Sequence, residues 1–131
     1  MKASLVSVLA VIAFLGCDTS RTLPRLDGIT RVEVRTNLDS LGTIDDSQRI
    51  TAIVGFANAR RDKWKKPWAG VPVGTLGVTF YAGRTVQGSF TAGLDFFESQ
   101  QEGDWFSRDA TATEVAEWRA LLAPYRAVTS R

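Results

Sequence analysis

Residues 75–92, TLGVTFYAGRTVQGSFTA, carry the pattern that decides the fold expected for this chain. Apolar and polar side chains alternate on both sides of Ala82-Gly83, a pair typical of a tight turn. Alternation over this length is typical of β-strands with one buried and one wet face. The stretch therefore predicts an antiparallel hairpin. Its inward side chains are expected to be Leu76, Val78, Phe80, Val86, Phe90 and Ala92, and its outward residues Thr75, Gly77, Thr79, Tyr81, Thr85, Gln87, Ser89 and Thr91.

Shorter patterns of the same kind flank this hairpin. Residues 29–36 alternate around Val32 and Val34, with charged residues on the other phase, and predict an earlier half-buried strand. Residues 37–42 are expected to form a loop. Residues 94–98 and 105–107 predict two further short strands on either side of a turn at 101–104.

Two amphipathic helices complete the expected domain. The first has Asp45 as N-cap, with Gln48 as its capping partner. Its apolar stripe is Ile50, Ile53, Val54 and Ala57. The second begins with a capping box at residues 111–114, ends at Pro124 and carries the stripe Val115, Trp118, Leu121 and Leu122. Because amphipathic helices cover the apolar face of a sheet, the sequence predicts an α+β fold: a two-layer antiparallel sheet of four or five strands with two helices on one face.

The first 17 residues have the character of an export signal. A positive start, Met1-Lys2, precedes an apolar run over residues 3–15. This run is shorter than the roughly 20 apolar residues that cross a bilayer. It ends in Phe14-Leu15-Gly16-Cys17, which resembles the lipobox of bacterial lipoproteins. Gly16 and Cys17 match the most constrained positions of that motif, whereas Phe14 and Leu15 replace the usual leucine and small residue.

The resemblance implies a location for the protein. In bacterial lipoproteins the signal is cut before the cysteine, whose thiol receives diacylglycerol and whose new amino group is usually acylated, for example with palmitate. The chain would then consist of a signal peptide (1–16), a lipidated Cys17 with a flexible tether (17–28) and one α+β domain (29–131). The protein would be held on a membrane of the bacterial cell envelope, facing the periplasm or the outer surface. The alternative is an inert Cys17 in an ordinary signal peptide or anchor.

Composition narrows the class of function. The chain has no histidine and one cysteine. Catalytic Ser-His-Asp or Cys-His groups and histidine-built zinc sites are therefore excluded. No cofactor, metal or nucleic-acid partner is expected. We expect a non-enzymatic binding module whose partner is an envelope protein or an anionic polymer.

Two surfaces are candidates for binding. One is the polar face of the sheet, with Arg31, Glu33, Arg35, Thr79, Tyr81, Gln87 and Thr91. The other is a basic, aromatic segment with Arg60, Arg61, Lys63, Trp64, Lys65, Lys66 and Trp68. Cations interleaved with tryptophan suit anionic lipid headgroups or acidic envelope polymers. The structural alternative is that these cations complement a helix C-terminus and the tryptophans pad the edge of the core.

Charged residues leave two further alternatives open. Seven basic residues and one acidic residue lie in 49–84, whereas two basic and seven acidic residues lie in 85–125. These stretches either orient the domain over a charged membrane or neutralise each other in the fold. The carboxylates Asp45-Asp46, Asp95 with Glu98, and Glu102 with Asp104 could serve a glycan hydrolase, which needs two carboxyl groups flanking a cleft. Helix capping and turn formation explain most of them equally well.

Overall fold

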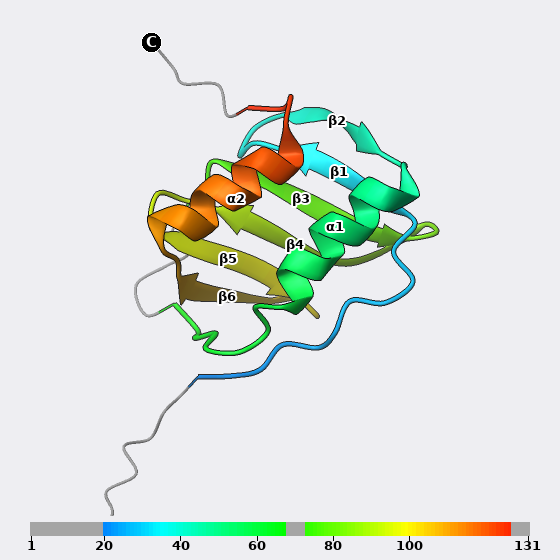
Figure 1. Ribbon diagram of the computed structural model, residues 1–131. Coiled ribbons are helices and arrows are strands. Elements are labelled where there is room, and N and C mark those ends of the chain that lie inside the picture. The colour runs from blue at the N-terminus through cyan, green and yellow to red at the C-terminus, as the bar shows by residue number, and fades with distance from the viewer. Residues whose placement is uncertain (1–19, 68–72, 127–131) are drawn as a thin grey trace, which may run out of the picture.

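The domain is a six-stranded antiparallel sheet with two helices on one face (Figure 1). The computed structural model describes residues 20–67 and 73–126. Along the chain the elements are β1 (Arg31–Arg35), β2 (Ser40–Ile44), α1 (Ser47–Asn58), β3 (Leu76–Ala82), β4 (Thr85–Ala92), β5 (Phe96–Gln101), β6 (Asp104–Asp109) and α2 (Ala112–Leu122). The strands lie in the order β2-β1-β3-β4-β5-β6. The α+β prediction is confirmed, with more strands than the four or five expected.

The additional strand is β2, whose first three residues lie in the stretch predicted to be a loop. It pairs with β1 at the sheet edge through Val32↔Ile44 and Glu33↔Thr43. Only Ile44 of this strand is buried. Edge strands bury little surface, so the alternation that reveals a strand from its sequence is weak here.

The predicted hairpin is confirmed as β3 and β4, with one change of register. Leu76↔Ala92 and Val78↔Phe90 pair over the core. A bulge then leaves Gln87 outside the ladder, because Phe80 pairs with Gly88 and Tyr81 with Val86. A bulge moves the following side chains to the opposite face. The prediction that Val86 points inward is therefore wrong: its side chain lies on the same face as Tyr81 and is 57% exposed.

Both helices form where the sequence predicted them. The N-cap of α1 is Asp46 rather than Asp45, and its carboxylate accepts the Arg49 backbone N–H at 3.0 Å. The capping box of α2 is formed by Thr111 and Glu114 as predicted. Phe56 of α1, absent from the predicted stripe, packs edge-on against Phe90 and Phe97. This aromatic cluster, completed by Trp64 and Trp118, fills the layer between the helices and the sheet.

The segment before β1 is packed on the domain and is not a free tether. Leu23 and Leu26 are buried, at 5% and 7% exposure. The backbone of Arg21 pairs with that of Trp64, and Leu23 N–H donates to the Arg61 carbonyl at 2.7 Å. In Figure 1 this segment, in blue, runs along the domain before it enters β1. The prediction of a flexible tether is therefore wrong for residues 20–28, because two apolar side chains complete the core edge.

The remainder of the predicted leader, including Cys17, lies outside the described residues. Within the part of the chain that is described, no helix combines the length and apolar character needed to cross a bilayer.

Candidate functional site

The two helices cover one face of the sheet, and no helix or strand of the described residues covers the other, which we call the open face (Figure 1). The open face carries six of the seven residues predicted to form a partner surface, and the seventh, Gln87, lies outside the strand ladder. Arg31, Arg35 and Gln87 are exposed, and the other four, Glu33, Thr79, Tyr81 and Thr91, are half-buried. Gln87 stands at the bulge, beside the turn end of the hairpin. The predicted residues fall into two groups. One is a cluster of charged groups around Tyr81, and the other lines a hollow beside it.

At one end of this face the charged groups interact with each other. Tyr81 Oη donates to Glu33 Oε2 at 3.1 Å, and Arg35 Nη1 donates to Glu33 Oε1 at 3.2 Å. The guanidinium of Arg31 lies 4.1 Å from the centre of the Tyr81 ring. Burial and the hydrogen bond to Glu33 raise the pKa of the Tyr81 hydroxyl above its ordinary value. These mutual contacts leave this end with few groups free to recognise a partner.

Next to this end lies a hollow of about 360 Å³, which we call the sheet groove. Its size falls within the range of small-molecule sites. The register continues across the sheet through Arg35↔Gly77, Gly77↔Thr91, Thr91↔Glu98 and Glu98↔Ser107. The groove runs along this row from β1 to β6. Its lining is Arg35, Thr36, Asn37, Gly77, Val78, Thr79, Ser89, Thr91, Glu98, Gln100 and Trp105.

Gly77 allows close packing at the groove. A Cβ atom at position 77 would collide with the Thr91 hydroxyl and would lie 2.7 Å from the Phe90 carbonyl oxygen. The Thr91 side chain occupies this space and also packs against Gly74. The absence of a side chain at Gly77 therefore permits the close approach of Thr91.

Glu98 is the most deeply buried polar side chain of the groove, at 7% exposure. Its Oε1 accepts a long hydrogen bond, 3.4 Å, from the Gly74 backbone N–H. Its Oε2 is shielded from solvent and has no hydrogen-bond partner among the described residues. Burial raises the pKa of the Glu98 carboxyl above its ordinary value, although the Gly74 hydrogen bond opposes this effect. The neutral carboxyl is favoured because ionisation in a buried site costs solvation free energy.

Trp105 and Gln100 stand side by side at the β6 end of the groove, as partners in the register. Trp105 is 40% exposed, which is unusual for so large an apolar side chain. The sequence predicts a strand at Trp105 but no binding role for its side chain. The alternation of the strand could have indicated that Trp105 points outward, because Trp105 and Ser107 lie on one side of β6 and the buried Phe106 lies on the other.

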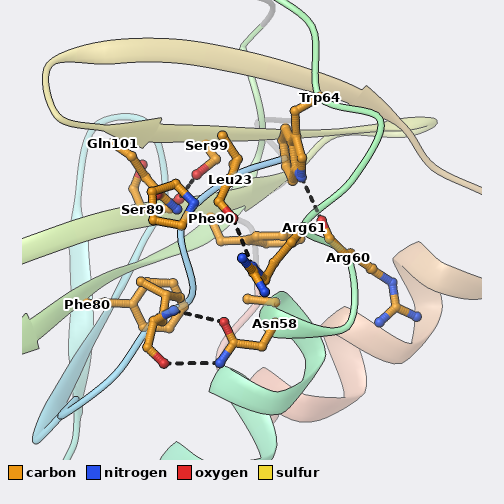
Figure 2. Close-up of a pocket in the computed structure, with 13 residues that line it drawn as sticks. Leu23, Asn58, Arg60, Arg61, Trp64, Phe80, Ser89, Phe90, Ser99 and Gln101 are labelled. Atoms are coloured by element: carbon orange, nitrogen blue, oxygen red, sulfur yellow. Dashed lines mark hydrogen bonds between the residues drawn. The ribbon is translucent and has the colours of Figure 1, made fainter. Parts of the chain in front are cut away.

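The basic, aromatic segment is largely structural. The buried Trp64 donates its Nε1–H to the Arg60 carbonyl at 2.6 Å. Arg61 donates to the Leu23 carbonyl at 2.8 Å. Figure 2 shows these groups around a cavity of about 10 Å³, space for no more than about one water molecule. Two of the seven predicted surface residues, Arg61 and Trp64, thus hold the segment 20–28 on the domain, and Arg60 accepts the Trp64 N–H with its carbonyl.

The remaining cations of this segment reach solvent. Lys63, Lys65 and Lys66 are exposed, and Lys66 lies 3.8 Å from Asp104. Lys63 and Lys65 border a second hollow, of about 550 Å³, together with Ser20 and Arg108. Two carboxylates, Asp109 and Glu114, also line this hollow, so its charge is mixed. Trp68 lies outside the described residues.

The two stretches of opposite charge meet in the fold. Arg60 Nε lies 2.6 Å from Glu114 Oε2, and Arg60 Nη2 lies 3.4 Å from Glu117 Oε2. Arg60 also stacks on Phe56, with its guanidinium carbon 3.6 Å from the ring centre. Together with the pair Lys66–Asp104, these contacts favour the interpretation in which the two stretches neutralise each other.

The carboxylates considered for hydrolysis are dispersed. Asp95 precedes β5, Glu98 lies within it, and Glu102 forms the following turn with a φ of 53°. At about 3.3 Å per strand residue, Asp95 and Glu102 lie on the order of 10 Å or more from Glu98 along the chain. Among the described residues, Glu98 is the single carboxylate in the lining of the sheet groove. Over residues 20–67 and 73–126, no three metal-ligating side chains form a cluster.

Comparisons with known proteins do not assign this chain to a family or a function. The chain matches no model of a protein family, no curated protein and no solved structure. Function must therefore be argued from the site itself.

Proposed function

We propose that this protein is a lipid-anchored lipoprotein of the bacterial cell envelope whose domain binds a partner through the open face of its sheet. The observation that carries the binding role is the sheet groove. One face of the sheet is covered by α1 and α2, whereas the other presents a hollow lined by polar side chains and a half-exposed tryptophan. A concave surface where a few polar groups converge beside an apolar side chain has the features of a binding site.

The proposed anchor rests on the lipobox-like residues 14–17. The packing of residues 20–28 on the domain limits how far the domain could lie from such an anchor. Cys17 and Ser20 are three residues apart, and three residues span at most about 11 Å. A domain that begins at Ser20 would thus stay beside the bilayer surface, because only three positions separate Ser20 from the lipidated Cys17.

Two measurements test the two parts of this proposal. For the anchor, intact mass of the membrane-extracted protein should show the loss of residues 1–16 and the added mass of diacylglycerol and an acyl chain. A Cys17→Ser variant should lack both changes. Recovery of the wild-type protein with its leader intact and no lipid would contradict the anchor.

For the binding role, a photo-crosslinking amino acid at Thr79 would sample the groove in cells. The matched control is the same group at Leu94, which is 79% exposed and outside the groove lining. We expect a discrete adduct from position 79 that position 94 does not give. Equal labelling at both positions would show that the open face has no specific partner.

A second candidate function is favoured by the place where the chain enters the domain. The exposed Arg21 pairs through its backbone with Trp64, which puts it beside Lys63 and Lys65. These cations would lie next to the anchor, within reach of anionic headgroups that attract each cation by about 1 kcal/mol. Binding of residues 18–131 to anionic vesicles should then fall with salt and be lost in Lys63→Glu/Lys65→Glu. Binding that responds to neither change would exclude this role.

A further inference from the structure

We propose that the sheet groove binds an uncharged saccharide chain that stacks on Trp105 and hydrogen-bonds to the Glu98 carboxyl and the neighbouring Thr79 and Gln100. This inference rests on the proposed function, since it names the ligand of the same open face. An envelope location would put glycan polymers within reach of the groove.

The direction of the groove argues against an added β-strand as its ligand. The groove crosses β1, β3, β4, β5 and β6, whereas an added strand needs a free sheet edge. Most backbone groups along this row are used in the ladders between these strands, and where the β4–β5 ladder ends, beyond Thr91↔Glu98, the Gln100 N–H donates to the Ser89 hydroxyl. Recognition in the groove therefore depends mainly on side chains. At about 4.8 Å per strand, the row from β1 to β6 spans about 19 Å, enough for a chain of several units.

The charges of the groove favour a neutral ligand. Arg35 is its one cationic lining residue among those described, and its guanidinium is paired with Glu33 at 3.2 Å. Glu98 is its one acidic lining residue among them, and its burial favours the neutral carboxyl. An anionic polymer would meet no free cationic cluster in this groove, in contrast to the exposed lysines near Arg21.

The hydrogen-bonding groups of the groove match a polyhydroxylated ligand. Glu98 Oε2 has no partner within the described structure, and such a buried oxygen costs free energy until it gains one. The terminal torsion of glutamate is broad, so a small rotation would present this oxygen to the groove. The Ser89 hydroxyl oxygen accepts the Gln100 backbone N–H at 3.0 Å, which leaves its own hydrogen free to donate. Hydroxyl groups of a sugar can both donate to and accept from such groups.

Trp105 supplies the apolar half of the recognition. Its ring reaches solvent at 40% exposure, while Trp64 and Trp118 are buried in the core at 1% and 0%. A sugar ring presents C–H groups on one face and hydroxyls at its edge. The indole of Trp105 can stack on the C–H face, and the neighbouring amide and hydroxyl side chains can hydrogen-bond to the hydroxyls at the edge. A flat aromatic surface also loses little conformational entropy on binding.

The test is calorimetric titration of the full-length, membrane-extracted protein with the uncharged tetramer of N-acetylglucosamine, in a detergent without a sugar headgroup. We expect binding that Trp105→Ala weakens about tenfold or more. Glu98→Ala should also weaken binding, whereas Glu98→Gln, which keeps the shape and polarity of the side chain, should stay near wild type. Leu94→Ala, an exposed leucine outside the groove, should have no effect. Circular dichroism of each variant reports whether it is folded.

A second arm uses insoluble peptidoglycan sacculi, and the tetramer should compete with them for the protein. No binding of the tetramer at millimolar concentration, or binding that Trp105→Ala leaves unchanged, would overturn the proposal. Competition by poly-glutamate rather than by the tetramer would overturn it in favour of an anionic ligand. If the tetramer fails but the crosslinker at Thr79 still captures a specific partner, the saccharide assignment falls and the binding module stands. If both fail, both proposals fall.

Discussion

The side-chain amide of Asn58 pairs with both backbone groups of Leu26. Its Oδ1 accepts the Leu26 N–H at 2.9 Å, and its Nδ2 donates to the Leu26 carbonyl at 3.0 Å (Figure 2 shows Asn58). The side chain of Asn58, at the C-terminal end of α1, thus satisfies both backbone hydrogen-bonding groups of a residue more than 30 positions earlier. This contact holds the part of the chain nearest the proposed anchor on the domain.

Asn58→Ala should release this segment. Loss of both hydrogen bonds is expected to lower the free energy of unfolding by about 1–3 kcal/mol, since each net bond contributes about 0.5–1.5 kcal/mol. Urea unfolding measures the loss, and limited proteolysis should show earlier cleavage within residues 20–28. Asn37→Ala, at an exposed loop position, is the control and should change neither. Unchanged proteolysis in Asn58→Ala would show that Leu23 and Leu26 hold the segment without the amide.

Gly77→Ala should destabilise the sheet, because its new Cβ would collide with Thr91 and the Phe90 carbonyl. Overpacking of this kind costs about 1–3 kcal/mol. Gly55→Ala is the matched control: no atom lies within 4 Å of its added Cβ, and it stands inside α1. Because alanine favours helix over glycine, this control should gain about 0.5–1 kcal/mol. Thermal unfolding of the two variants should therefore shift in opposite directions.

Glu114→Gln should destabilise the protein in a pH-dependent way. Burial raises the pKa of the Glu114 carboxyl, but the hydrogen bond from Thr111 and the Arg60 guanidinium outweigh it and hold the pKa below 4.5. A carboxyl whose pKa is lower in the folded protein than in the unfolded chain stabilises the fold at pH values above its unfolded pKa. This stabilisation is lost as the pH falls through the folded pKa. We expect a cost of about 1–3 kcal/mol at pH 6 that shrinks below about pH 4.5.

The control for this prediction is Glu117→Gln. Glu117 pairs with the same Arg60 at 3.4 Å but is 55% exposed, so its removal should cost under about 1 kcal/mol. Urea unfolding from pH 3 to pH 6 measures both variants. Equal costs for the two would show that the half-buried Arg60–Glu114 contact contributes no more than an exposed ion pair.

Glu98→Gln should have the opposite pH dependence. Burial raises the pKa of the Glu98 carboxyl above 4.5. At pH values between the pKa of Glu98 in the unfolded chain and its higher pKa in the folded protein, the folded state binds more protons. The free energy of unfolding therefore falls as the pH rises through this range. The amide cannot ionise, and Glu98→Gln should therefore be more stable than wild type at pH 7 but not at pH 4. Unfolding at the two pH values checks this, and a variant less stable at both would contradict it.

The alternation in residues 75–92 and the capping box at 111–114 were sufficient to predict the fold class, because both signals are local. The same local reasoning missed β2, whose edge position removes the alternation, and misplaced Val86, because a bulge is set by pairing with β3. It also treated residues 20–28 as a tether, since isolated Leu23 and Leu26 show no periodicity.

What the sequence by itself determined is the pair of layers and, with the exception of Val86, the outward residues of the central hairpin. Period-2 and period-3.6 patterns depend only on which side chains avoid water. Tertiary structure alone decided which outward residues meet: Arg35, Glu98 and Trp105 come from three strands, and their common groove follows from strand order and register. It also decided that Arg60 and Trp64 are structural, because their partners lie in α2 and in the segment before β1. Such long-range pairings are absent from any local pattern in the sequence.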